Sequence, residues 1–246
     1  MIQIRSTLFF IFLLLFTPVY AVMCFIFFPF MNASRRYDLV SGWNITVVQI
    51  AKYLCKINYT IKGAENLEKM IDKPVVLLSK HQSAWETIAF IALMPKQLCF
   101  VFKRELLWIP FFGWALGMLK MIHIDRSKGA AAAHSIASQG KKHLADGNWI
   151  IIFPEGTRTA RGSNPTYRKG GAKLASNTGA WVIPIAHNAG QCWPRNSFLK
   201  SPGTITVSIG EPMNTATMSA EEVHQKTVSW IESEMRVIDP QAYAPK

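Results

Sequence analysis

The stretch "KPVVLLSKHQSAWETIAFIALM", residues 73–94, holds the pattern that decides the fold of this chain. Residues 73–79 form a short apolar run that is typical of a buried strand, and residues 84–94 are typical of a helix. A buried strand followed directly by a helix is the repeating unit of a parallel sheet covered by helices. The stretch therefore predicts an α/β protein.

The same alternation continues along the rest of the chain. Further short β-like runs lie at residues 97–102, 121–124, 148–153, 181–187 and 204–209. Helical stretches separate these runs. Ser219 and Glu222 have capping-box spacing and predict the start of the last helix. We expect a mostly parallel sheet flanked by helices, preceded by an N-terminal membrane-anchoring helical segment.

The amino terminus, "RSTLFFIFLLLFTPVYAVMCFIFFPFMNASRR", has no charged residue between Arg5 and Arg35. This run is long enough to span a bilayer or to enter it deeply. A cleaved signal peptide is the alternative, but the apolar run continues well beyond Ala21, which favours a retained anchor. Pro18 and Pro29 leave open whether the anchor is a single span or a re-entrant hairpin.

More positive charges follow the apolar run than precede it, and this places the remainder of the chain in the cytoplasm by the positive-inside tendency. Residues 37–59 mix apolar and polar side chains, as a second, interfacial helix does. We expect residues 1–60 to form the membrane anchor with this interfacial helix, and residues 61–246 to form the catalytic domain.

The chain is basic, with 27 lysines and arginines against 15 acidic residues and a formal net charge of +12. Its basic doublets are scattered beside apolar segments, and no nucleic-acid-binding signature is present, so we predict no nucleic-acid partner. Anionic lipid or a phosphorylated substrate remains. The four cysteines show no CxxC spacing, and no histidine pair has the spacing of zinc ligands, so we predict buried thiols and no metal.

Polar residues follow several of the expected strands. They are Lys80-His81, Lys103-Arg104, Asp125-Arg126 and the "PEGTR" segment at 154–158. In open α/β sheets, ligands bind at the carboxyl ends of the strands, so these groups are expected to converge there.

His81 and Glu86 are the first candidate pair. Positions i and i+5 of a regular helix point about 140° apart, so the two side chains meet only if one of them lies outside the helix. Ser83 and Glu86 have capping-box spacing, which would start the helix at Ser83 and leave His81 in the preceding turn. Two interpretations follow: Glu86 orients the His81 imidazole, or Glu86 only caps the helix and His81 is a solvated loop residue.

Four blocks occur together in a familiar order. They are His81 with an acid five residues later, "FKRELLWIPFFG" (102–113), "FPEGTR" (153–158) and "VIPIAHN" (182–188). In order and approximate spacing the chain resembles the glycerolipid acyltransferase family, and within it the bacterial-type 1-acyl-sn-glycerol-3-phosphate acyltransferases (lysophosphatidic acid acyltransferases). The resemblance covers roughly residues 61–212. Lys80 and Glu86 depart from it, because the family more often has asparagine and aspartate at these positions.

The resemblance implies that His81 is the general base for a lipid hydroxyl and that Glu86 orients it. It assigns acceptor binding to Glu155, Gly156, Thr157 and Arg158. Glycine permits close backbone approach, threonine offers a hydroxyl and arginine a guanidinium, which are suitable donors for a phosphate.

Lys103 and Arg104 are secondary candidates for acceptor or donor phosphates. Residues 106–119 carry no charge and are too short to cross a bilayer, so they form either a buried helix or one lying in the membrane interface.

The implied reaction moves an acyl group from an acyl-CoA or acyl carrier protein thioester to the sn-2 hydroxyl of lysophosphatidic acid, with no cofactor. Membrane lipids are further partners, and the implied location is the bacterial inner membrane with the catalytic domain on the cytoplasmic face. Two alternatives stay open. One is an acyltransferase for another lysophospholipid or lipid alcohol, and the other is a non-catalytic protein that binds anionic lipid.

Overall fold

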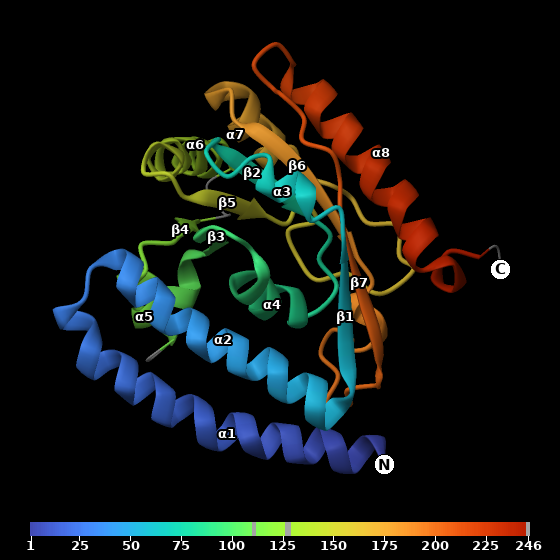
Figure 1. The fold of residues 1–246 in the computed structure, drawn as a ribbon. Helices are drawn as coiled ribbons and strands as arrows, with labels where there is room; N and C mark the ends of the chain where they lie inside the picture. The colour runs from blue at the N-terminus through green and yellow to red at the C-terminus, as the bar shows by residue number, and fades with distance from the viewer. Residues whose placement is uncertain (110–111, 126–128, 245–246) are drawn as a thin grey trace.

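The computed structural model describes residues 1–109, 112–125 and 129–244. Its centre is a seven-stranded sheet of order β1-β7-β6-β2-β5-β3-β4 (Figure 1). The strands are β1 (Ile57–Lys62), β2 (Val75–Ser79), β3 (Leu98–Lys103), β4 (Ile122–Ile124), β5 (Trp149–Ile152), β6 (Trp181–His187) and β7 (Gly203–Ile209). Every neighbouring pair is parallel except β6 and β7. The expected mostly parallel sheet with flanking helices is confirmed.

The most apolar strands occupy the middle of the sheet. All residues of β2 and β5 are buried, and the two strands pair in parallel with Val76 opposite Ile150. Alternate residues of a strand face opposite sides of a sheet, so a strand covered on both faces must be apolar throughout. This is why residues 73–79 and 148–153 were recognisable as strands.

Helices cover both faces of the sheet (Figure 1). On one face, Leu77 and Ile151 share a core with α2 (Ala33–Cys55) and α4 (Trp85–Leu93). On the other face, Val76 and Ile150 share a core with α6 (Gly129–Ala145) and α7 (Gly170–Thr178). The remaining α-helices are α1 (Ile2–Phe27), α3 (Glu65–Glu68), α5 (Phe112–Met118) and α8 (Ala220–Ile238). The expected capping box of Ser219 and Glu222 starts α8.

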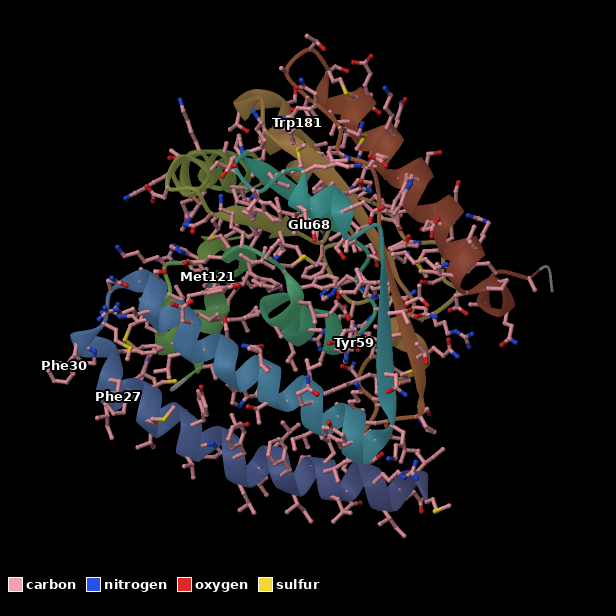
Figure 2. All side chains as sticks on the ribbon, in the orientation of Figure 1. Phe27, Phe30, Tyr59, Glu68, Met121 and Trp181 are labelled. Carbon is pink, nitrogen blue, oxygen red and sulfur yellow. The ribbon has the colours of Figure 1, made fainter. Side chains whose placement is uncertain are left out.

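Helices α1 and α2 form a hairpin through the short 3₁₀ turn η1 (Phe28–Phe30), and α1 lies along the lower edge of the molecule in Figure 1. Residues Ile2–Phe30 make one helical segment long and apolar enough to cross a membrane, with mean hydropathy 2.5. Phe27 and Phe30 point outward at the turn (Figure 2), and Phe30 is 84% exposed.

Both ends of this hairpin contact the domain. Near the N-terminus, the Ser6 hydroxyl accepts a 2.9 Å hydrogen bond from the backbone N–H of Lys200. Near the turn, the Arg36 guanidinium donates to the carbonyl of Met118 at 3.3 Å. Phe9 is buried edge-on against Trp193. One side of α1 is therefore fixed to the protein, while the other side remains exposed and apolar.

Strand β1 differs from the expectation for residues 37–59. The helix α2 ends at Cys55, with Lys56 in the left-handed conformation at φ 57°, and β1 begins at Ile57. This strand crosses the expected boundary between residues 60 and 61. Its apolar and polar residues alternate, and Ile57 lies opposite Gly203 of β7, far away in the sequence.

The uncharged stretch 106–119 is not one buried helix. It is divided between the 3₁₀ helix η2 (Arg104–Trp108) and α5, and residues 110–111 lie outside the described chain. Trp108 is 80% exposed and Trp114 is 52% exposed, although the Trp114 ring also packs on Phe25 of α1 at 6.1 Å. Of the two expected placements, the exposure favours the interfacial one.

Candidate active site

His81 and Glu86 meet in the turn between β2 and α4. The Nδ1 atom of His81 lies 2.8 Å from Oε1 of Glu86. The same oxygen accepts hydrogen bonds from the backbone N–H groups of Gln82 at 2.9 Å and Ser83 at 2.8 Å. Helix α4 begins at Trp85, two residues after Ser83, where the capping-box spacing would start it. The backbone N–H of Trp85 donates to the Ser83 hydroxyl. Glu86 therefore orients His81 and satisfies backbone amides at the helix start at once.

This arrangement determines which nitrogen of His81 is available. Because a carboxylate can only accept, Nδ1 carries the proton and the neutral ring keeps Nε2 as an acceptor. The His81 ring stacks on Phe153 with centroids 4.0 Å apart, and its side chain is 13% exposed while that of Glu86 is fully buried. The pair is thus held rigidly, with a route to the surface through the imidazole.

Glu86 is ionised in this setting. Burial would raise the pKa of its carboxyl, but His187, His81 and the Ser83 amide together lower the pKa below its usual value. A buried carboxylate that accepts several hydrogen bonds favours its charged form. Glu86 can therefore stabilise a positive charge on the imidazole.

The backbone of His81 is held on both sides by the loop after β5. Its N–H donates to Oε1 of Glu155 at 3.1 Å, and its carbonyl accepts from the backbone N–H of Thr159 at 2.8 Å. The Thr159 hydroxyl also donates to Oε2 of Glu155. Glu155 is only 5% exposed, and its carboxylate faces Lys80.

Gly156 and Thr157 form the turn that follows Glu155. The Gly156 backbone has φ +71°, and its N–H donates to the Phe153 carbonyl at 2.9 Å. An added Cβ at Gly156 would lie 3.1 Å from Nε of Arg168, so a guanidinium rests directly against this glycine. Thr157 is exposed and Arg158 is partly exposed.

Three guanidinium groups gather around this turn. Besides Arg158 and Arg168, Arg195 donates from Nη1 to the carbonyl of Arg158 at 2.6 Å. No carboxylate pairs with the Arg158 side chain in the part of the chain that the structure describes. Neither Arg168 nor Arg195 was predicted as a site residue: Arg168 belongs to a basic doublet, which usually indicates solvated surface, and Arg195 is a single arginine with no motif around it.

Lys103 and Arg104 lie at the carboxyl end of β3. This strand pairs in parallel with β5, so its end opens on the same edge of the sheet as His81 and the "PEGTR" turn. Both side chains are exposed. The expected convergence of polar groups at this edge is therefore found for these segments, while Arg126 lies outside the described residues.

A model of the acyltransferase family matches residues 58–188, more than half of the chain. The chain belongs to this family. It is 41% identical to the 1-acyl-sn-glycerol-3-phosphate acyltransferase of Pseudomonas aeruginosa over 241 residues, 96% of this chain and 92% of that protein. It is 29% identical to the mouse 1-acyl-sn-glycerol-3-phosphate acyltransferase alpha over 175 residues, 70% of this chain and 61% of the relative.

The fold of this acyltransferase has a solved counterpart. The crystal structure of the 1-acyl-sn-glycerophosphate acyltransferase of Thermotoga maritima matches with a TM-score of 0.77 and covers all of both chains at 21% identity. The likeness extends over the N-terminal hairpin as well as the sheet, since the whole chain is covered.

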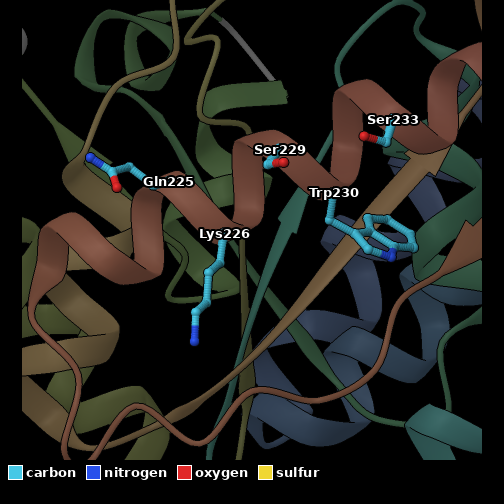
Figure 3. A pocket seen from close by; sticks show the side chains of 5 residues that line it. All are labelled: Gln225, Lys226, Ser229, Trp230 and Ser233. Carbon is cyan, nitrogen blue, oxygen red and sulfur yellow. The ribbon is translucent and has the colours of Figure 1, made fainter.

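Two further features were compared with the candidate site, a possible metal cluster and a surface pocket. The described residues hold no group of three histidine, cysteine or acidic side chains arranged for a metal. A shallow pocket on α8 (Figure 3) contains none of the expected site residues; it is lined by Gln225, Lys226, Ser229, Trp230 and Ser233.

Proposed function

We propose that this acyltransferase moves a fatty acyl group from a thioester to the sn-2 hydroxyl of 1-acyl-sn-glycerol 3-phosphate, giving phosphatidic acid and a free thiol. The observation that carries the proposal is the His81–Glu86 pair, with its 2.8 Å contact, on the same edge of the sheet as the cations Lys103, Arg104 and Arg158. The names of the P. aeruginosa and mouse relatives support the same acceptor.

In the proposed mechanism His81 acts as the general base. Its Nε2 accepts the hydroxyl proton while the acceptor oxygen attacks the thioester carbonyl, and a general base of this kind contributes about 10²–10⁴ in rate. The tetrahedral intermediate then expels the thiolate, and the imidazolium returns the proton to the sulfur. Glu86 stabilises the imidazolium between these two steps. No protein nucleophile is needed, because the acceptor supplies the hydroxyl.

The phosphate of the acceptor would bind beside the "PEGTR" turn. Arg158 has no carboxylate partner among the described residues, and its planar guanidinium suits two phosphate oxygens at once. Lys103 and Arg104 add positive charge from the neighbouring strand, and the exposed Thr157 hydroxyl adds a donor. Glu155 supports this turn from beneath through His81 and Thr159, since both its oxygens are engaged within the protein.

The thioester can be carried by coenzyme A or by an acyl carrier protein, and the chemistry at His81 is the same for both. No cofactor enters the proposed reaction. Exposed Lys103 and Arg104 are available to the phosphates of either carrier.

We infer that α1 and α2 hold the enzyme on one membrane surface as a hairpin, without crossing the bilayer. The N-terminal end of α1 bonds Lys200 and its C-terminal end packs on Trp114, so both ends stay beside the same domain. A helix spanning the bilayer would separate its ends by about 30 Å across the membrane. The exposed apolar side of α1, with Leu14 and Leu15, then faces lipid. We propose the cytoplasmic face of a bacterial inner membrane, with the anchor ending near Cys55.

The proposal is tested by acyl transfer in mixed micelles. Purified enzyme receives a long-chain acyl-CoA or acyl carrier protein thioester together with lysophosphatidic acid or lysophosphatidylcholine, and the lipid product is measured by mass spectrometry. Transfer that depends on lysophosphatidic acid, with at most a few per cent of that rate on the choline lipid, supports the proposal. Equal use of both acceptors refutes a phosphate-monoester site and moves the assignment to another lysophospholipid.

A further inference from the structure

Lys80 is a fully buried lysine directly before the candidate base. Its Nζ has three partners: the Tyr167 hydroxyl at 2.9 Å, Oε1 of Glu232 at 3.1 Å and Oε1 of Glu155 at 3.4 Å. The side chains of Lys80 and Glu155 are both 0% exposed, and that of Glu232 is 14% exposed. The contacts with Tyr167 and Glu232 are hydrogen bonds, and the contact with Glu155 is an ion pair. Because the Lys80 side chain is fully buried among these partners, its ammonium is not presented to a substrate phosphate.

The partners of Lys80 connect distant parts of the chain. Tyr167 follows the "PEGTR" turn, Glu232 belongs to α8, and Lys80 comes directly after the central strand β2. The Tyr167 hydroxyl also donates to Glu232, which closes the cluster. Helix α8 is thereby linked to the edge of the sheet that carries His81, through the buried ammonium of Lys80.

Glu155 transmits the effect of Lys80 to His81. The oxygen of Glu155 that faces Lys80 is the one that accepts the His81 backbone N–H. The Lys80 carbonyl is itself fixed by a 2.7 Å hydrogen bond from Nε2 of His187. A shift of the Glu155 carboxylate would move the His81 backbone, while Glu86 would still hold the ring.

The charges explain why a cation is needed here. Burial raises the pKa of Glu155 above its usual value, and Lys80 is the main group that acts in the opposite direction. Without Lys80, the fully buried Glu155 carboxylate would lose the cation that faces it, and Glu232 would keep only the ion pair with Arg236 at 3.9 Å. A buried carboxylate left without its partner is strongly unfavourable. A protonated Glu155 would no longer be a simple acceptor for His81 and Thr159.

We propose that Lys80 is a positioning residue, whose ammonium holds Glu155 against the His81 backbone and makes Glu232 of α8 part of the same support. This inference rests on the proposed role of His81 as the base. The positioning role gives a reason why this chain has Lys80 where the related family more often has asparagine. A lysine supplies the positive charge that pairs with Glu232, whereas a neutral amide would not.

The test compares Lys80→Met, Glu232→Gln and the double variant with wild type. The control is Lys69→Met, because the Lys69 side chain is 54% exposed and its two partners, Asn66 at 3.0 Å and Glu211 at 3.8 Å, do not belong to the Lys80 cluster. Turnover is measured per folded molecule in detergent, with kcat and the KM for lysophosphatidic acid determined separately. Thermal unfolding is followed on the same samples.

We expect Lys80→Met to lower kcat by about 10²-fold, because displacements of about 1 Å at a reacting group have effects of this size. The KM for lysophosphatidic acid should change less than threefold, and Lys69→Met should match wild type. Glu232→Gln should cost little further activity once Lys80 is replaced, since Glu232 acts through Lys80. A rise in KM at constant kcat would make Lys80 a phosphate ligand and overturn the inference. The inference would also be overturned if Lys80→Met were less stable but kept the wild-type kcat. The same holds if the kcat losses of Lys80→Met and Glu232→Gln multiplied in the double variant.

Tyr167→Phe covers the case in which Lys80→Met does not fold. It removes one hydroxyl from the cluster and leaves every charge in place, so kcat should fall about two- to tenfold, the range of one net hydrogen bond. A kcat equal to that of wild type would contradict the positioning role. Wild type without acceptor-dependent turnover would be a failure of the proposed function instead, which separates the two outcomes.

Discussion

Replacing Glu86 with glutamine removes one charge from the candidate dyad and leaves its shape almost unchanged. The hydrogen bonds to Glu86 from His81, Gln82 and Ser83 all end on the single oxygen Oε1. The amide oxygen of glutamine can accept all three, so the imidazole tautomer and the start of α4 should survive. Glu86→Ala is a poorer test, because two buried amides would lose their acceptor at about 1–3 kcal/mol each.

The size of the effect follows from the charge that is lost. Two unit charges about 4 Å apart interact by about 4 kcal/mol at an effective dielectric constant of about 20. If Glu86 stabilises the imidazolium formed at His81, its loss should lower kcat by about 10³-fold. The KM for lysophosphatidic acid should stay within about threefold, because Glu86 is buried away from any substrate.

The assay is acyl-thioester consumption at saturating acceptor, with Glu211→Gln as the matched control, since the Glu211 side chain is 78% exposed. A Glu86→Gln variant within tenfold of wild type, correctly folded, would refute the electrostatic role and leave Glu86 as a helix cap. Stability gives a second readout. Because the pKa of Glu86 is lowered on folding, its charge stabilises the fold above the ordinary value of 4.5. The melting temperature of wild type should exceed that of Glu86→Gln at neutral pH, and the difference should disappear as the pH falls through the lowered pKa.

The remaining predictions concern the phosphate site, the anchor and the thiols. Arg158→Ala should raise the KM for lysophosphatidic acid by about 10–100-fold, as the loss of a charge-assisted hydrogen bond implies, with the thioester KM within twofold; equal changes in both would contradict its role. Phe9→Ala should cost about 3–5 kcal/mol of unfolding free energy in detergent, because Phe9 is buried. Leu15→Ser, at a position 65% exposed, should keep the melting temperature and weaken co-sedimentation with anionic vesicles; unchanged sedimentation would argue against lipid contact by this face. Burial raises the pKa of Cys99 to about 12 and that of Cys192 to about 11, so a disulfide reagent near pH 8 should label the four buried cysteines only after denaturation, and rapid labelling of the native enzyme would show that these thiols are accessible.

Local patterns predicted much of this structure. The unit formed by β2 and α4 was visible because a central strand must be apolar on both faces, and the spacing of His81 and Glu86 placed the histidine before the helix. The two interpretations of Glu86, as the acid that contacts His81 and as a helix cap, do not exclude each other. One oxygen of Glu86 contacts His81 and also accepts the Ser83 backbone N–H, which sequence spacing alone does not show.

Features that depend on distant pairing were beyond the sequence. Strand β1 was placed with the preceding helix, because its partner β7 lies about 145 residues away and only its alternation at Ile57, Tyr59 and Ile61 marks it as a strand. The inward orientation of Glu155 depends on Lys80, and Lys80 depends on Glu232, 152 residues later. Charged side chains usually lie at the surface, so the local sequence did not predict that Lys80 and Glu155 are buried.

In the proposed mechanism His81 is the base that activates a lipid hydroxyl. This role is tested by the rate of phosphatidic acid formation by purified wild type and His81→Gln, with lysophosphatidic acid and a long-chain acyl thioester both saturating. We expect acceptor-dependent product from wild type, and a rate at least about 10²-fold lower from a His81→Gln variant that melts at the wild-type temperature. A folded His81→Gln enzyme that retains a rate within a few-fold of wild type would contradict it.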